Sequence, residues 1–382
     1  MNRHHLQQRV QQRVDELVDS GQETGVQVAA YLHGAPIVDA VAGLADPATG
    51  RAVTPGTPFF SFSTGKALTS TVVHVLAEQG RLDYDLRLAE VWPEFARNGK
   101  SGVTLRHVLT HTAGLPALPP DVTAADLADW GRMCAILADT APEWEPGTAH
   151  GYHVWTYGWL VGETVRRVTG RTLSQVLATD VAAPLGVPGE LLLRVPDEDL
   201  DRLAVLDERS WSDALKQLSA QLPNFDRAVP HGARPDADLG NDRSFLRAEV
   251  PAVGTITARA AARMFAALLG EVDGVRLISP ARLREATRPV TRGPVDIRHA
   301  GAVDARVRRR RSDDRGGRDR RQPGRGPARA GADHRGDEEL AGRRRRRPDG
   351  AAPRNDHLGG PGRGADDPAV PDPPRVMRPD PP

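Results

Sequence analysis

Residues up to about 290 and the residues that follow differ so much in composition that only the first part can form a packed core. From Thr291 onward the chain is dominated by arginine, glycine, proline and aspartate, and no phenylalanine, tyrosine or tryptophan follows Phe265. Roughly two dozen arginines there face about fifteen acidic residues, with hardly any hydrophobic period. This composition buries too little apolar surface to offset the entropy of an ordered chain. We therefore expect a globular domain over 1–290 and a disordered, low-complexity tail over 291–382.

The tail allows two interpretations. Its basic character would suit contact with nucleic acid or an acidic surface, but a tail without a partner is the simpler interpretation and the one we favour. The abrupt change also suggests a shifted reading frame in a G+C-rich coding sequence. Sequencing the gene across the codons for residues 285–300, with an intact mass, tests this hypothesis. An uninterrupted frame would remove it.

Charge, cysteine content and hydropathy limit the class of protein. The 382 residues carry a formal net charge of +1, so the whole molecule is not a polycation. The single cysteine, Cys134, excludes an internal disulfide and a cysteine-based zinc knuckle. The polar N-terminal stretch predicts an amphipathic helix with Val10, Val14 and Leu17 on one face, not a signal peptide. No stretch reaches transmembrane length. We expect a cytoplasmic protein that does not bind membranes.

The pattern within residues 1–290 predicts a mixture of strands and helices. Two short apolar runs on either side of the His-Gly pair at 33–34 predict a hairpin. A helix is expected from about Ser63 to a stop at Gly80, and glycine also ends the helices predicted before Gly170 and Gly270. We therefore expect two strands and many helices here.

The short stretch SFSTGK, Ser61 to Lys66, carries the strongest chemical signal. Only three of the 51 basic residues are lysines, namely Lys66, Lys100 and Lys216, so a lysine beside a serine is poorly explained as a surface charge. An arginine stays protonated, whereas a desolvated lysine can lose its proton and act as a base. With Ser63 in the first turn of a helix, Lys66 lies one turn on and on the same face. The pair suits acyl transfer, with Lys66 accepting the serine proton and the helix N-terminus stabilising the oxyanion.

Rival motifs fit less well. A P-loop needs a glycine where Phe60 stands and a hydroxyl where Ala67 stands, and a nucleophile elbow needs a glycine in place of Ser61. His107 and His111 have the i, i+4 spacing of a zinc protease, but a valine occupies the position of its glutamate. We interpret these histidines as helix-face and packing residues. No metal and no organic cofactor is implied.

Three longer stretches carry a resemblance. They are FFSFSTGKALTSTVVHVLAEQG, GVTLRHVLTHTAGLP and EWEPGTAHGYHVWTYGWLVGETVRRVTG, and they occur in consistent order. The chain resembles serine hydrolases of the β-lactamase and penicillin-binding-protein superfamily over about residues 20–290. The most similar branch holds class C β-lactamases, D-alanyl-D-alanine carboxypeptidases and related esterases. This resemblance implies an α+β fold, with an antiparallel sheet flanked by helices plus a helical domain.

The resemblance also implies roles for particular residues. Ser63 matches the acylated serine and Lys66 the lysine that helps to deprotonate it. Tyr152 matches the tyrosine of the second motif, which would pass the proton to the leaving group as a phenolate or as a relay. Val154 replaces the usual asparagine, which favours an esterase-like site over a lactamase site. The segment His111 to Pro116 matches one that shapes the loop near the site, and we assign it no chemistry.

Aromatic residues around the second motif leave alternatives open. Tyr152 itself could be an aromatic packed in the helical domain. Trp144, Trp155 and Trp159 flank it and could wall an apolar acyl pocket, but packing in the core is the interpretation that we favour.

The C-terminal part departs from the family pattern. A third motif on an edge strand, Lys-Thr-Gly, His-x-Gly or Gly-Gly, and three strands of the sheet are expected where the arginine-rich tail stands. His299 to Gly301 have the letters of His-x-Gly, but without an apolar strand around them we treat the match as coincidence. We therefore expect an incomplete sheet. Loss of one oxyanion donor would slow the reaction by about two to three orders of magnitude.

We predict a serine hydrolase that cleaves a small ester or amide through an acyl-enzyme on Ser63, esterase-like more than lactamase-like. The alternative is a catalytically impaired remnant of the family that at most binds acyl or peptidoglycan-like ligands. Nucleic-acid binding through the tail is a third and weaker hypothesis, and a steep salt dependence of binding would be its mark.

Overall fold

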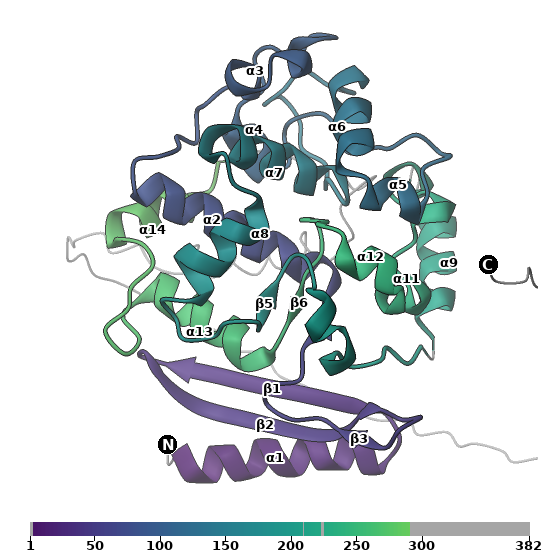
Figure 1. The fold of residues 1–382 in the computed structure, drawn as a ribbon, viewed down its shortest axis with the longest axis vertical. Helices are drawn as coiled ribbons and strands as arrows, with labels where there is room; N and C mark the ends of the chain where they lie inside the picture. Colours follow the sequence, from purple (N-terminus) through teal and green to yellow (C-terminus); the bar gives the residue numbers. More distant parts are fainter. Residues whose placement is uncertain (1–2, 209, 223–224, 291–382) are drawn as a thin grey trace, which may run out of the picture. The chain divides into compact units, whose positions relative to one another are not determined.

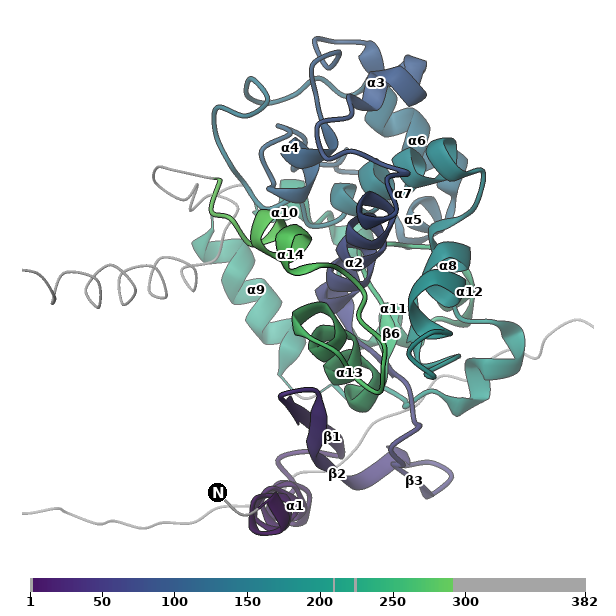
Figure 2. The ribbon, with the colours of Figure 1, turned by 90° about the vertical axis from the view of Figure 1, so that its left-hand side faces the viewer.

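The computed structural model describes residues 3–208, 210–222 and 225–290 (Figures 1 and 2). The strands are β1 Gly25–Leu32, β2 Ala35–Asp46, β3 Arg51–Ala52, β4 Phe59–Phe60, β5 Leu191–Leu192 and β6 Thr255–Ile256. The α-helices are α1 Arg3–Asp19, α2 Gly65–Glu78, α3 Leu88–Val91, α4 Leu105–Leu109, α5 Ala124–Ala128, α6 Trp130–Asp139, α7 Thr156–Thr169, α8 Leu173–Val176, α9 Trp211–Gln221, α10 Phe225–Ala228, α11 Ala237–Asn241, α12 Arg243–Arg247, α13 Ala258–Leu269 and α14 Pro280–Ala286. Short helical turns are η1 Phe62–Thr64, η2 Pro93–Ala96, η3 Leu177–Ala182, η4 Asp197–Arg202 and η5 His231–Ala233.

The N-terminal hairpin forms as the sequence predicts. Strands β1 and β2 pair antiparallel, with Gly25 opposite Gly43 at one end of the ladder. The two residues of the turn, His33 and Gly34, both have positive φ, +49° and +78°. This left-handed pair matches the twist of the two strands, which is why such turns are favoured in two-residue hairpins. The hairpin prediction is confirmed.

Helices α1 and α13 cover the sheet β1-β2-β3. Helix α1 packs on β2, where Val14 is buried against Val38 and Ala40 and Val10 joins the same cluster. Helix α13 contacts β1, and Figure 1 shows the sheet between the two helices. The amphipathic N-terminal helix is thus confirmed, and its apolar face exists because it covers one side of this sheet.

Strand β1 lies at one edge of this sheet among the described residues. The strand order is β1-β2-β3, so β1 pairs with β2 alone in that part of the chain, and none of its residues is fully buried. Within the described residues this sheet therefore has three strands, in keeping with the expected incomplete sheet. The expectations for the tail 291–382, including its disorder, its contacts and the His299–Gly301 match, lie outside the described residues.

A second small sheet corrects the sequence prediction of only two strands. Its order is β4-β6-β5, and both pairings are antiparallel. These strands have two residues each, which is too short to show the alternation by which strands are recognised. The sheet matters for the site, because it places Phe59 and Phe60, just before SFSTGK, next to a segment about 195 residues further on.

Helix α2 runs through the main hydrophobic core. Most of its residues are buried, and it contacts α7, α8, η3 and α14; Figure 2 shows it among these helices. Trp155 and Trp159 are buried in the same core, at 1% and 0% exposure, which confirms the packing interpretation for both. Trp144 is half-buried and donates from its indole to the carbonyl of Thr112. No helix in the described part of the chain is both long enough and apolar enough to cross a bilayer.

The surroundings of Lys100 explain why this position holds one of the three lysines of the chain. Its side chain is fully buried, and Nζ donates to the carbonyl oxygens of Arg97, Ala138 and Thr140 at 2.9, 3.0 and 2.5 Å. A compact ammonium with three donors suits three converging carbonyls better than a planar guanidinium does. This lysine joins the loop after η2 to the end of α6.

We expect Lys100→Met to lower the free energy of unfolding by about 2 kcal/mol, because the three buried carbonyl oxygens lose their donor. Lys216 is the matched control, since its side chain is 70% exposed and pairs with the exposed Asp213. Lys216→Met should change stability by less than about 0.5 kcal/mol. Urea unfolding of both variants gives the comparison, and equal effects would contradict a special role for Lys100.

Candidate active site

A tight strand-to-helix turn presents Ser63. Strand β4 ends at Phe60, and the Ser61 N–H donates to the carbonyl of Gly254 at 2.7 Å. Phe62 then adopts φ +33°, a conformation that non-glycine residues rarely adopt. Ser63 lies in the following turn η1 and is exposed, whereas α2 starts at Gly65. The α-helix thus begins two residues later than the sequence predicts, and the serine stands just before its first turn.

Lys66 lies beneath Ser63. Its Nζ is 3.2 Å from Ser63 Oγ and 3.1 Å from the carbonyl oxygen of Ala252, and the residue is only 8% exposed. The predicted neighbourhood of Ser63 and Lys66 is therefore present. Burial lowers the pKa of the Lys66 amine from 10.5 to about 7, because removal from water disfavours the charged form. Within the described residues no carboxylate pairs with Lys66 to oppose this shift.

Tyr152 comes from the loop before α7 and completes a group of three. The Lys66 amine lies 5.1 Å from the centre of the Tyr152 ring. The Tyr152 hydroxyl also interacts with the Ser63 side chain. Burial raises the pKa of Tyr152 above its ordinary value, so the phenol is neutral near pH 7. The three residues singled out from the sequence, which are up to 89 positions apart, meet at one place.

Two further residues at this place were given no chemistry from the sequence. The ring of His111 lies 4.7 Å from that of Tyr152 and 5.2 Å from that of Tyr157. The Tyr157 ring lies 6.0 Å from the Lys66 amine, and burial raises the Tyr157 pKa. The sequence carries no distinct signal for Tyr157, which is one of two aromatic residues in α7. His111 lies in the HTAGLP segment, which was expected to shape the loop near the site.

The HTAGLP segment is joined to the loop that carries Tyr152. The Leu115 N–H donates to His153 at 3.0 Å, and the Leu115 carbonyl accepts from Thr156 at 2.6 Å. The His107 ring accepts from the backbone N–H of Thr104 at the start of α4. His107 and His111 therefore serve different places, a helix cap and the Tyr152 loop, although they are only four residues apart.

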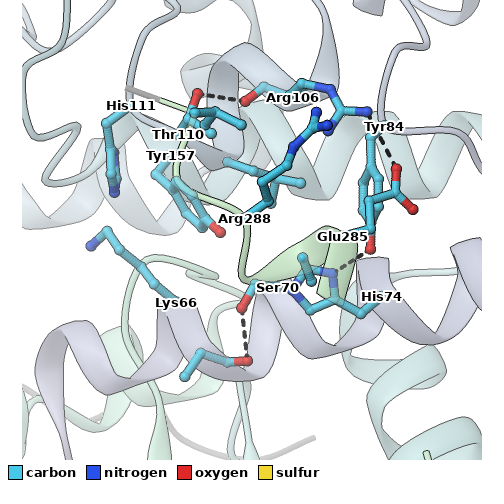
Figure 3. Close-up of a pocket in the computed structure, with 14 residues that line it drawn as sticks. Lys66, Ser70, His74, Tyr84, Arg106, Thr110, His111, Tyr157, Glu285 and Arg288 are labelled. Carbon is cyan, nitrogen blue, oxygen red and sulfur yellow. Dashed lines mark hydrogen bonds and ion pairs between the residues drawn. The ribbon is translucent and has the colours of Figure 1, made fainter. Parts of the chain in front are cut away.

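A cavity of about 310 Å³ extends from Lys66 along α2 (Figure 3). Ser70 and His74, one and two turns after Lys66, line the same side of the helix. His111 and Tyr157 stand at the Lys66 end, as Figure 3 shows. The volume suits a small molecule, and the lining is partly apolar and partly polar.

Comparisons with known proteins agree with the fold. Two solved structures are each 35% identical to this chain. A family VIII carboxylesterase has a TM-score of 0.66 and covers 75% of this chain and 76% of its own. A penicillin-binding protein homologue from Caulobacter crescentus has a TM-score of 0.65 and covers 78% of each chain. The fold is therefore that of carboxylesterases and penicillin-binding proteins.

The family model described as Beta-lactamase matches residues 10–303. The curated relative esterase/beta-lactamase LipL of Mycobacterium tuberculosis (strain ATCC 25618 / H37Rv) is 35% identical over 274 residues, 69% of this chain and 63% of LipL. This chain belongs to the Beta-lactamase family, and the resemblance seen in the sequence is confirmed. The part of LipL that this chain matches is less than two thirds of the length of LipL.

Proposed function

We propose that this chain is a serine hydrolase that cleaves small esters through an acyl-enzyme on Ser63. The main observation behind this proposal is the buried Lys66 amine, which lies 3.2 Å from Ser63 Oγ and has its pKa lowered to about 7. Near neutral pH a large fraction of this amine is unprotonated and able to accept a proton. The relatives and neighbours named esterase and carboxylesterase support the same reaction class.

In the proposed acylation, Oγ of Ser63 forms a bond to the carbonyl carbon of the ester while its proton passes to Nζ of Lys66. The negative charge moves to the carbonyl oxygen, and the N-terminus of α2 stabilises it through free N–H groups and the helix dipole. The bond to the leaving alcohol then breaks. Tyr152 gives its proton to the leaving oxygen and is reprotonated from Lys66.

Hydrolysis of the acyl-enzyme uses the same groups in reverse. Water attacks the acyl carbon, its proton passes to the Tyr152–Lys66 pair, and Ser63 Oγ leaves and regains its hydrogen. The raised pKa of Tyr152 supports the relay role over the phenolate role in this scheme, because a phenol that keeps its proton near pH 7 is available as an acid.

The choice of ester over β-lactam rests on Val154. Its side chain is half-buried and packs against the hydrophobic core. It therefore offers no amide near Tyr152 to hold the side chain of a β-lactam or peptide substrate. The alternative function, a remnant that only binds acyl or peptidoglycan-like ligands, is supported by the edge position of β1 in the described part of the sheet.

A fluorophosphonate probe tests the proposal, because it reacts covalently with activated serines. We expect one label per chain, found by mass spectrometry on the peptide that carries Ser63 and lost in Ser63→Ala. Ser70→Ala is the matched control, since Ser70 lines the cavity and donates to the carbonyl of Ala67; it should label like the wild type. Labelling that survives Ser63→Ala would refute the assignment, and an unlabelled wild type would favour the remnant.

A further inference from the structure

The backbone of His111 is held in an unusual conformation. Its φ is +58°, in the left-handed region, where a residue with a side chain costs about 1 kcal/mol or more. Two backbone hydrogen bonds hold it there: its N–H donates to the carbonyl of Val108 at 3.0 Å, and its carbonyl accepts from Gly151 at 3.0 Å. The second bond ties His111 directly to the residue before Tyr152.

The imidazole of His111 is fixed in one tautomer. The backbone N–H of His153 donates to Nδ1 at 3.2 Å, so Nδ1 carries no proton and the neutral ring carries its hydrogen on Nε2. Burial lowers the His111 pKa well below its usual value, and the nearby Lys66, His150 and His153 disfavour the charged form further. The ring therefore stays neutral beside Lys66.

This ring is packed among the aromatic residues of the site. It lies between Tyr152, Tyr157 and His153, with ring centres 4.7, 5.2 and 5.6 Å away. Figure 3 shows His111 at the end of the cavity where Lys66 and Tyr157 also stand. One residue thus holds the Tyr152 loop in two ways, through hydrogen bonds with the backbone N–H groups of residues 151 and 153 and through contact with the Tyr152 ring.

We propose that His111 is a positioning residue that holds the Tyr152 phenol toward Ser63 and Lys66. This inference rests on the proposed function, and its test uses kcat/KM, which reports the acylation step in which the leaving group departs. In the proposed mechanism Tyr152 protonates the leaving alcohol. A misplaced phenol should therefore lower kcat/KM most for substrates whose leaving group must take up a proton. A residue that only supports the fold would slow all substrates alike.

The experiment compares His111→Asn on two esters with the same acyl group. Asparagine tolerates positive φ, and its Oδ1 can accept from the His153 N–H, so the change removes mainly the ring. An alkyl ester releases an alcohol that must be protonated, whereas a nitrophenyl ester releases a stable anion. We expect kcat/KM to fall about ten- to a hundredfold for the alkyl ester and by less than about threefold for the nitrophenyl ester.

Tyr152→Phe should show the same dependence on the leaving group, and adding His111→Asn to it should cause little further loss, because both changes act on one proton transfer. His107→Asn is the matched control: it removes the ring that accepts from Thr104 and should affect both esters equally. If His111→Asn does not fold by its melting curve, His111→Gly, which adopts positive φ freely, replaces it.

An equal fall of kcat/KM for both esters in the folded His111 variant would overturn the proposal and leave His111 a structural residue. So would full additivity with Tyr152→Phe. Failure of the proposed function looks different, since the wild type would then take no fluorophosphonate label on Ser63 and would hydrolyse neither ester.

Discussion

Replacing Lys66 by arginine is expected to lower kcat/KM for ester hydrolysis by about a hundred- to ten-thousandfold, the usual contribution of a general base. A guanidinium stays protonated at every working pH, so it cannot take the proton of Ser63. The amine that it replaces is buried, lies 3.2 Å from Ser63 Oγ and has a pKa of about 7. Hydrolysis of a nitrophenyl ester by purified wild type and variant at pH 8 measures the effect.

The wild-type pH profile gives a second measure of the same group. The neutral amine is the active form, so kcat/KM should rise with pH through about 7 and level off above the pKa of Lys66. At pH 6, one unit below this pKa, about a tenth of the maximal rate is expected. The residual rate of Lys66→Arg should lack this rise, because its side chain does not titrate in the range.

Lys216→Arg is the matched control for this prediction, since Lys216 is exposed on α9 and pairs with Asp213. It should keep the wild-type rate and profile. A Lys66→Arg enzyme with more than about a tenth of the wild-type kcat/KM would contradict the base role. A wild-type rate that still rises above pH 9 would contradict the lowered pKa. If the wild type does not hydrolyse the ester, the alternative function, a remnant that only binds ligands, is the better description.

Of the glycine-to-alanine substitutions near the site, Gly65→Ala is expected to destabilise the protein most. It should lower the free energy of unfolding by about 3 kcal/mol. Gly65 opens α2 and packs directly on the backbone of the segment that precedes β6. A Cβ at this position would overlap the carbonyl group of Val253. Backbone cannot rotate away as a side chain can, so α2 and this segment would have to separate.

That separation would also reach the site. The same segment accepts from Ser61, from the Lys66 amine through Ala252 and from Thr69 through Pro251. We therefore expect Gly65→Ala to reduce both the midpoint of urea unfolding and the fluorophosphonate labelling of Ser63.

Gly131→Ala tests whether the effect belongs to the close contact and not to the loss of a glycine. Gly131 is exposed in the first turn of α6, and an added Cβ there would make only an ordinary contact, 3.5 Å from the Asp129 carboxylate. Alanine should stabilise this helix by up to about 1 kcal/mol. If Gly65→Ala unfolds at the wild-type midpoint, the close packing of α2 against Val253 does not stabilise this part of the fold.

Much of the fold could be predicted because it follows from local patterns. The hairpin shows as two apolar runs around His33 and Gly34, the helix that starts near Ser63 ends at a glycine, and α1 has an apolar face. The two-residue strands β4, β5 and β6 show no such pattern, and the sequence prediction missed them for that reason. They form because segments distant in the chain happen to lie side by side in the folded molecule.

The candidate site likewise has residues that could be predicted from the sequence and one whose role could not. The positions of Ser63 and Lys66 were predicted, since residues three apart share a helical face, and Tyr152 was found through the resemblance alone. The proposed role of His111 could not be inferred from the residues next to it in the sequence. It depends on a hydrogen bond to His153 and a ring contact with Tyr152, each about 40 positions away.

The sequence by itself determined which chemical groups stand near each other along the chain, because the spacing of a serine and a lysine in one helical turn follows from backbone geometry. Only the tertiary structure decided that the amine of this lysine is buried, which is what the proposed base role requires. The segment around Ala252 and the ring of Tyr152 exclude water from the amine. The free energy of that desolvation depends on atoms brought in from elsewhere in the chain, which no local pattern encodes.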